Sequence, residues 1–212
     1  MKDFPMFDTE FGIASLVLKE IPYKGEAYIL LREVWDAEQL LAECVSFCRM
    51  AGAEKIFATG HEILETYPYH TTMLEMRGEA AVEPSMLESL FPVTEATVKR
   101  WREIYNEKMR PVPNSAMMTV KDEKQLLDSV GAYFVHHDGE LLGIGWIQEP
   151  ELRVVASVKP GAGQRVLNTM LSLVEGEMVE LTVASTNERA IRLYEKMGFI
   201  KTKELSRWYK VK

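Results

Sequence analysis

The stretch that decides the fold is Ser185-Thr186-Asn187-Glu188-Arg189-Ala190-Ile191-Arg192-Leu193-Tyr194-Glu195-Lys196-Met197-Gly198-Phe199. It follows the apolar run Val179–Ala184, which predicts a strand. Ser185 and Glu188 have the spacing of a capping box, so a helix is predicted from about Thr186 to Met197. Gly198 supplies a signal for its end, because glycine commonly follows the last helical residue.

Two polar residues of this helix are candidates for function. Tyr194 follows Ala190 by four residues and Ile191 by three, which places it on the inward edge of the helix. A tyrosine there usually serves packing, but its hydroxyl can protonate a departing thiolate within hydrogen-bond reach. Asn187 either serves only the start of the helix or directs its amide toward a ligand.

A glycine-containing junction, Val158-Lys159-Pro160-Gly161-Ala162-Gly163-Gln164, precedes this region. It joins the apolar strand Leu152–Val158 to a predicted helix. Glycines permit positive φ and close backbone approach, and free N–H groups at a helix start favour an anion such as pyrophosphate. The same turn is also an ordinary tight strand-to-helix connection, so both interpretations stay open.

Earlier in the C-terminal part, turn signals delimit two helices and a hairpin. A helix after Thr94 is predicted to stop at Pro111 and Pro113, and Asp138-Gly139 is a strong hairpin signal. The expected elements are a short helix over Glu123–Ser129 and strands over Tyr133–Val135 and Leu141–Ile147. Trp101 and Tyr105 are expected in the core, and His136 and His137 beside the turn are expected to be exposed.

The N-terminal third has the rhythm strand, strand, helix, strand, short helix, strand. The predicted strands cover Phe11–Ile21, Glu26–Val34, Lys55–Thr59 and Thr71–Met76, with a helical turn over Ile63–Tyr67. Asp36 and Gln39 mark the start of the longer helix, and Gly52 its end. Residues 78–92 are the least patterned, so the predicted domains are 1–85 and 86–212.

Composition limits the classes of function. The 212 residues carry a net charge of −7, which disfavours broad binding to nucleic acid. No apolar run approaches the ~20 residues of a membrane span, and the N-terminus lacks signal-peptide features, so a cytoplasmic location is expected. Cys44 and Cys48, four apart on a predicted helix, indicate buried apolar positions, and no metal site is expected.

The run from Ser185 to Phe199 closely resembles the C-terminal motif of the GNAT superfamily of acyl-CoA-dependent N-acyltransferases. The order of elements over roughly Ser89–Lys212 also resembles that fold. The resemblance implies an α/β (α+β) fold with a mixed, mostly antiparallel central sheet flanked by helices, beside a smaller N-terminal α/β subdomain. It also implies transfer of an acetyl group from acetyl-CoA to a primary amine by direct attack in a ternary complex.

The resemblance assigns roles to particular residues. The pantetheine arm would meet the backbone of Ala156, Ser157 and Val158, between two strands that splay apart. The remaining implied cofactor contacts are Gly161, Ala162, Gly163 and Gln164 for the pyrophosphate, Asn187, and Tyr194 near the sulfur as general acid. Glu149 and Glu151, at the start of the strand, are candidate general bases, although each taken singly is more simply a solvated strand-end acid.

Two departures from the family pattern stand out. The usual basic or amide residue before the first glycine is missing or replaced by Lys159. The N-terminal third resembles a shortened GNAT half, but its strand-to-helix turn, Glu33-Val34-Trp35-Asp36-Ala37, has no glycine and carries an acid that would repel pyrophosphate. It is interpreted either as a degenerate repeat without a second site or as an unrelated cap.

The acceptor cannot be read from the sequence beyond a small-molecule or peptide amine. No nucleic-acid or membrane partner is expected, and the chain is expected to be a monomer or a homodimer. Two alternatives to an enzyme are a non-catalytic acyl-CoA-binding sensor and an interaction module on the same fold. The shortened turn favours the sensor, whereas Asn187 and Tyr194 together favour the enzyme.

Overall fold

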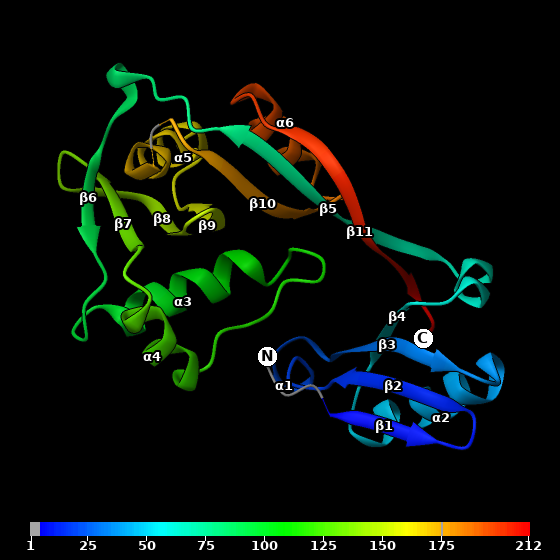
Figure 1. The fold of residues 1–212 in the computed structure, drawn as a ribbon. Coiled ribbons are helices and arrows are strands. Elements are labelled where there is room, and N and C mark those ends of the chain that lie inside the picture. Colours follow the sequence, from blue (N-terminus) through cyan, green and yellow to red (C-terminus); the bar gives the residue numbers. More distant parts are fainter. Residues whose placement is uncertain (1–4, 175) are drawn as a thin grey trace. The chain divides into compact units, whose positions relative to one another are not determined.

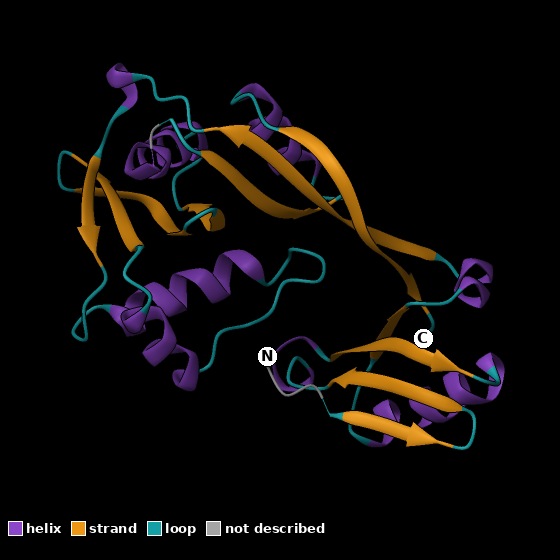
Figure 2. Ribbon diagram, in the orientation of Figure 1, coloured by secondary structure: helices purple, strands orange, loops and turns teal. Residues whose placement is uncertain are grey.

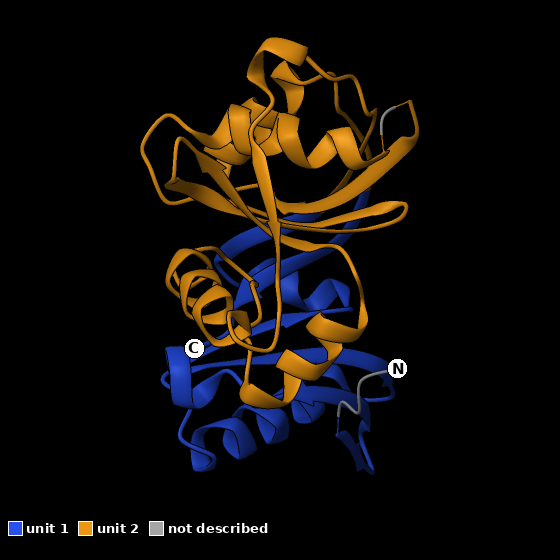
Figure 3. Ribbon diagram, turned by 90° about the vertical axis from the view of Figure 1, so that its left-hand side faces the viewer, with its two compact units in different colours: residues 1–73, 204–212 blue, residues 74–203 orange. Residues whose placement is uncertain are grey.

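The computed structural model describes residues 5–174 and 176–212 (Figure 1). Their contacts group the chain into two compact units, residues 1–73 with 204–212 and residues 74–203 (Figure 3). The division cuts through two long strands, Tyr69–Glu79 and Ile200–Lys210, each of which contributes to both units. The predicted domains 1–85 and 86–212 stay a prediction, because contact units and domains need not coincide.

Strands and helices alternate along most of the chain (Figure 2). The strands are β1 Met6–Thr9, β2 Gly12–Val17, β3 Glu26–Val34, β4 Lys55–Thr59, β5 Tyr69–Glu79, β6 Ser89–Pro92, β7 Ala132–His137, β8 Glu140–Gln148, β9 Glu151–Ser157, β10 Met178–Ala184 and β11 Ile200–Lys210. The α-helices are α1 Ile21–Lys24, α2 Ala37–Met50, α3 Val98–Met109, α4 Val120–Asp128, α5 Gly163–Leu171 and α6 Glu188–Lys196. Short 3₁₀ turns are η1 Glu62–Thr66, η2 Pro84–Met86 and η3 Ser172–Val174.

The first unit is a sheet with α2 packed on one face. β2 is antiparallel to β1 and β3, β3 and β4 are parallel, and the end of β11 runs antiparallel to β4. Asp36 caps α2 by accepting the N–H of Gln39, as predicted. Cys44 and Cys48 are buried against the sheet as free thiols, and burial raises their pKa values to about 12 and about 11.

The second unit has the strand order β5-β10-β9-β8-β7-β6, with the first part of β11 beside β5. The pairs from β6 to β9 are antiparallel, and β9 and β10 are parallel. One apolar cluster joins the sheet to α5 and α6, and another joins its opposite face to α3 and α4. The predicted fold class, a mixed and mostly antiparallel sheet flanked by helices, is confirmed.

Local signals were accurate at several elements and wrong at two. The hairpin turn has positive φ at Asp138 and Gly139, the geometry that the sequence predicted. The strand predicted to reach Ile21 ends at Val17, because Ile21 begins α1 with proline in its first turn. The last helix is capped by Asn187 and not by Ser185. None of the described helices combines the length and apolar character that crossing a bilayer requires.

Candidate active site

The parallel strands β9 and β10 are joined at one point only, at the first residue of β9 and the third residue of β10. Their register consists of a single pair, Glu180 with Glu151, and the Glu180 N–H donates to the Pro150 carbonyl at 2.9 Å. Beyond this point β9 continues to Ser157 and β10 to Ala184 without further pairing between them. The two strands therefore diverge in the direction of the glycine turn, as the resemblance implies for an acyl-CoA site.

The edge of β9 that faces this gap carries backbone groups with no strand partner. On the other edge, the Val158 N–H donates to the Leu142 carbonyl at 2.8 Å, and Ala156 is paired with Ile144. Because backbone groups alternate in direction along a strand, those of Val155 and Ser157 point toward β10. Of the backbone groups predicted to meet a pantetheine arm, those of Ser157 have the right direction, whereas those of Ala156 and Val158 point toward β8.

A β-bulge interrupts β9 close to where β10 leaves it. Leu152 is paired with Ile147 and Val154 with Trp146, so Arg153 is an extra residue. The bulge changes the face to which the side chains point: Leu152 packs in the α5–α6 cluster, whereas Val154 packs in the α3–α4 cluster. It places Arg153 with its guanidinium carbon 5.2 Å from the Trp146 ring centre.

The glycine turn delivers α5 with its first backbone N–H groups free. Gly161 has φ of 82°, a conformation that favours glycine. No acid lies in the first turn of α5, and the first helical N–H groups, those of Gly163, Gln164 and Arg165, have no partner within the helix. A Cβ at Gly163 would lie 3.4 Å from Leu193 Cδ2, so α5 begins close to α6. This is the geometry of an anion site.

Tyr194 lies on the face of α6 that packs in the same cluster as Val155 and Leu181. Its ring centre is 6.1 Å from that of Phe199, and burial raises the pKa of its hydroxyl to about 12. The phenol is therefore protonated at neutral pH. Asn187 uses its side-chain oxygen to accept the Ala190 N–H at 3.4 Å, so its predicted contact with a cofactor stays a prediction.

A pocket of 520 Å³ lies at the paired ends of β9 and β10. It is lined by Glu75, Gln148, Glu149, Pro150, Glu151, Arg153, Glu180, Leu181 and Thr182. Since Leu181 packs in the α5–α6 cluster, Glu180 and Thr182 project to the opposite face of the sheet. Both carboxylates that the sequence nominated as bases, Glu149 and Glu151, line this pocket.

Several pocket residues were not identified from the sequence. Glu151 forms an ion pair with Arg153 at 3.0 Å, and Glu180 forms one with Arg77 at 2.9 Å. A hydrogen bond from Thr202 to Glu75, at 2.8 Å, is the main cause that lowers the pKa of that carboxyl, so Glu75 is an anion. These residues come from separate strands, and only the strand order brings them together.

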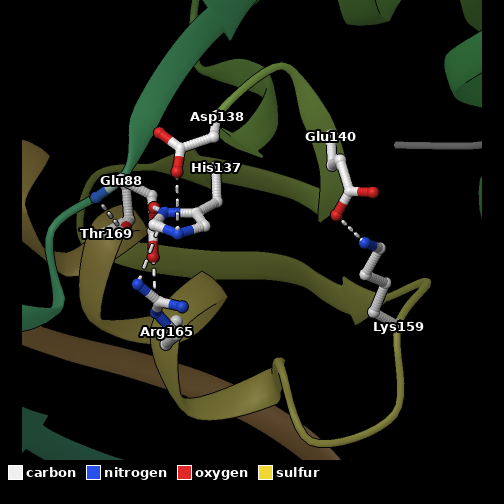
Figure 4. Close-up of polar contacts among 7 residues, drawn as sticks. All are labelled: Glu88, His137, Asp138, Glu140, Lys159, Arg165 and Thr169. Atoms are coloured by element: carbon white, nitrogen blue, oxygen red, sulfur yellow. Dashed lines mark hydrogen bonds and ion pairs between the residues drawn. The ribbon is translucent and has the colours of Figure 1, made fainter.

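A polar network holds α5 against the hairpin β7–β8 (Figure 4). Glu88, whose side chain is 3% exposed, forms an ion pair with Arg165 and lies 2.8 Å from His137 Nδ1. The Glu88 N–H also donates to Thr169 Oγ1 at 3.1 Å. His137 is about half exposed, close to the expectation, but the carboxylate that it contacts comes from the stretch with the weakest pattern.

Comparisons with known proteins support the fold. No family model matches the sequence, and no curated protein matches it either. Among solved structures, a GCN5-related N-acetyltransferase from Sphaerobacter thermophilus has a TM-score of 0.54 at 14% identity, covering 93% of this chain and 75% of that one. Another from Kribbella flavida has a TM-score of 0.55 at 11% identity, covering 96% and 58%.

A conserved protein of unknown function from Staphylococcus epidermidis is similar as well, with a TM-score of 0.59 at 9% identity and coverage of 96% and 91%. These likenesses define the class of fold. The chain has a GNAT-like fold, as its C-terminal motif implied. Within residues 5–174 and 176–212, no group of three or more His, Cys, Asp or Glu is arranged to hold a metal ion.

Proposed function

We propose that this protein is an N-acetyltransferase that transfers an acetyl group from acetyl-CoA to a primary amine. The observation that carries the proposal is the divergence of β9 and β10 after one residue pair, between a free helix N-terminus and Tyr194. The unpaired backbone of Val155 and Ser157 would hydrogen-bond the pantetheine amides. The N–H groups of Gly163 and Gln164 would hold the pyrophosphate, because a helix start favours negative charge.

The acceptor amine would enter from the 520 Å³ pocket, which lies on the face opposite α5. Its carboxylates favour an amine over an anionic acceptor. A neutral amine nitrogen then attacks the thioester carbon, the new C–N bond forms, and the C–S bond breaks. Glu149 or Glu151 takes the amine proton, directly or through water. Glu149 is the better candidate, because Glu151 is already engaged by Arg153.

Tyr194 would supply a hydrogen bond, and finally a proton, to the leaving sulfur. Its pKa of about 12 keeps it in the donating form. A thiol has a pKa of about 8.5, so the phenol is the weaker acid of the two. We therefore expect Tyr194 to act chiefly by hydrogen-bonding the developing thiolate, with transfer completed as bulk water restores its proton.

The test is acetyl-CoA turnover with a panel of primary amines, accompanied by titration of acetyl-CoA alone. Saturable binding with release of free CoA that depends on the amine supports the proposal. Binding without turnover for any amine favours an acyl-CoA sensor. No saturable binding of acetyl-CoA at millimolar concentration contradicts both.

A further inference from the structure

The first unit (blue in Figure 3) has a pocket of 560 Å³ that the proposed acetyl transfer does not use. It lies where the parallel strands β3 and β4 end, beside η1 and the last part of β11. The carboxyl ends of neighbouring parallel strands are a common place for ligands in α/β folds. The turn after β4 packs tightly on β3, because Gly60 has φ of 107° and a Cβ there would clash with the Leu31 carbonyl oxygen. Backbone packing therefore fixes this wall of the pocket.

Arg32 presents a guanidinium to this pocket in a fixed orientation. Leu31 packs in the cluster around α2, so the next residue of β3, Arg32, points to the opposite face of the sheet. Its Nε–H donates to the Ser15 hydroxyl at 3.2 Å, and Ser15 is only 4% exposed. No carboxylate of the described residues lies at ion-pair distance from Arg32, so its two terminal nitrogens have no anionic partner. An arginine held in this way presents the fork that binds a carboxylate through two hydrogen bonds.

Two further hydrogen-bond donors line the same pocket. Thr59, the last residue of β4, is 7% exposed, and its hydroxyl makes no hydrogen bond to any described residue. His61 Nδ1 accepts the Ile63 N–H at 3.2 Å, so the proton of the neutral ring is on Nε2, for which the described chain supplies no acceptor. Since buried polar groups are normally hydrogen-bonded, the Thr59 hydroxyl indicates that a ligand or water completes this site.

The negative charges of the pocket come from η1. Glu62 and Glu65 are three residues apart, which places them on one side of a 3₁₀ turn. The second guanidinium of the pocket, that of Arg207, is held by Glu204 at 2.8 Å, so its charge is largely cancelled. In the part of the chain that the structure describes, the unpaired charges of the pocket are therefore those of Arg32, Glu62 and Glu65. Such a set complements a ligand that carries both a carboxylate and an ammonium group.

We propose that the first unit binds a small amino-carboxylate, as a zwitterion, in this pocket. Arg32 binds its carboxylate with help from the Thr59 hydroxyl, and Glu62 with Glu65 binds its ammonium group. The site is separate from acyl transfer, because β3 stays paired with β4 from Glu26 to Leu30 and leaves no opening for a thioester. The proposal therefore does not depend on the proposed function.

The experiment is titration of the ¹⁵N-labelled protein, without acetyl-CoA, followed by amide NMR spectra. The probes are L-alanine, 4-aminobutyrate and 6-aminohexanoate, in which the two charges are increasingly far apart. Butyrate and butylamine are the singly charged controls. We expect at least one amino-carboxylate to shift the amide signals of Gly60 and His61 saturably at millimolar concentration. Butyrate and butylamine should bind about tenfold more weakly or less, because each lacks one charged contact.

Variants assign the contacts. Arg32→Gln should weaken binding of the best amino-carboxylate about tenfold, whereas Arg49→Gln, on an exposed position of α2, should bind like wild type. Thr59→Val keeps the shape of the side chain, so it tests the hydroxyl in a folded protein, and it should weaken binding about threefold. The double variant Glu62→Gln/Glu65→Gln should weaken binding of the amino-carboxylate about tenfold and leave that of butyrate unchanged.

Several results would overturn the proposal. Butyrate that binds as tightly as the best amino-carboxylate would exclude a zwitterion as the preferred ligand. Equal affinities of wild type and Arg32→Gln, or shifts confined to the second unit, would exclude this pocket as the site. The absence of saturable shifts with all three amino-carboxylates at tens of millimolar would exclude the class of ligand. Acetyl-CoA turnover is measured separately, so none of these results would overturn the proposed function.

Discussion

Glu180 and Glu151 form the single residue pair through which β10 and β9 are joined as parallel strands. In the first unit, the parallel strands β3 and β4 are paired continuously from Glu26 with Lys55 to Leu30 with Thr59. Both strand pairs are connected by a helix, α5 in one case and α2 in the other. Only the β9–β10 pair leaves the unpaired strand edges that a pantetheine arm requires, which is why we locate acyl transfer in the second unit.

The variant Tyr194→Phe tests whether the Tyr194 hydroxyl is the catalytic acid. We expect kcat to fall about 100-fold, because positioned proton donors contribute on this scale, while KM for acetyl-CoA stays within about twofold. The matched control is Tyr67→Phe, which removes the same hydroxyl from the first unit and should leave turnover unchanged. Steady-state kinetics with the amine that is acetylated fastest gives kcat and KM for both variants. An unchanged kcat for Tyr194→Phe would show that sulfur departs without this hydroxyl.

The raised pKa of Tyr194 has its own signature in tyrosinate absorbance. Burial raises the folded-state value from 10.0 to about 12. The neutral phenol thus contributes stability that is present in full below about pH 10 and is lost as the pH rises through about 12. At roughly pH 11, folded wild type and Tyr194→Phe should therefore contain the same amount of tyrosinate, whereas unfolded wild type should contain more than unfolded Tyr194→Phe. A tyrosinate difference between the folded proteins at that pH would contradict the burial of the hydroxyl.

Substitution should show which of the two candidate bases, Glu149 or Glu151, accepts the amine proton. We expect Glu149→Gln to lower kcat about 100-fold at neutral pH and to weaken its rise with pH, because the proton acceptor is lost. Glu151→Gln should have a smaller effect, about tenfold or less, because Glu151 is engaged by Arg153. pH–rate profiles of both variants measure this. The assignment is reversed if Glu151→Gln, and not Glu149→Gln, is the variant whose rate no longer rises with pH.

Gly163 begins α5 beside Leu193 of α6, so the next substitutions test the size of the side chain at this position. A Cβ would meet Leu193 at 3.4 Å, which is ordinary contact, so Gly163→Ala should bind acetyl-CoA like wild type. Gly163→Phe should bind at least about tenfold more weakly, because the ring must displace either Leu193 or the ligand. Titration measures affinity, and circular dichroism checks that the helix content is kept. Wild-type affinity in Gly163→Phe would place the pyrophosphate elsewhere.

Features of the fold and of the candidate site were predictable from the sequence where the residues involved lie close together along the chain. Asp36 with Gln39 and the turn at Asp138-Gly139 are signals contained within four residues, and both were identified correctly. The motif that ends in Gly198-Phe199 also predicted the fold, because the resemblance carries tertiary information that periodicity lacks; the role that it assigns to Tyr194 stays a prediction. The cap of α6 was misplaced because Ser185 and Asn187 are both good capping residues and lie only two apart.

Contacts between distant segments were not predictable from the residues. Glu88 and His137 are 49 positions apart, and Glu88 and Thr169 are 81 apart. No local pattern marks Glu88, because its partners are set by the order of β6, β7 and the helix α5. The bulge at Arg153 was likewise hidden, since polar and apolar residues alternate through it as in a regular strand.

The network around Glu88 gives the last prediction, on stability. Glu88→Ala removes an almost fully buried carboxylate and leaves Arg165 and His137 without it. Loss of a partner from a buried ion pair is costly, but Arg165 is 40% exposed and can regain water. We therefore expect a loss of about 2 kcal/mol in the free energy of unfolding, below the cost of breaking a fully buried pair.

Urea unfolding measures this loss, with Glu140→Ala as the matched control. Glu140 pairs with Lys159 at the same hairpin, but both side chains are well exposed, so we expect no measurable change. A double-mutant cycle with Arg165→Met isolates the ion pair: Glu88→Ala should cost less when Arg165 is already absent. If Glu88→Ala and Glu140→Ala unfold at the same urea concentration, the Glu88 side chain contributes no stability, and α5 is held by its apolar face and its other hydrogen bonds, such as that between Asn168 and the Glu83 backbone.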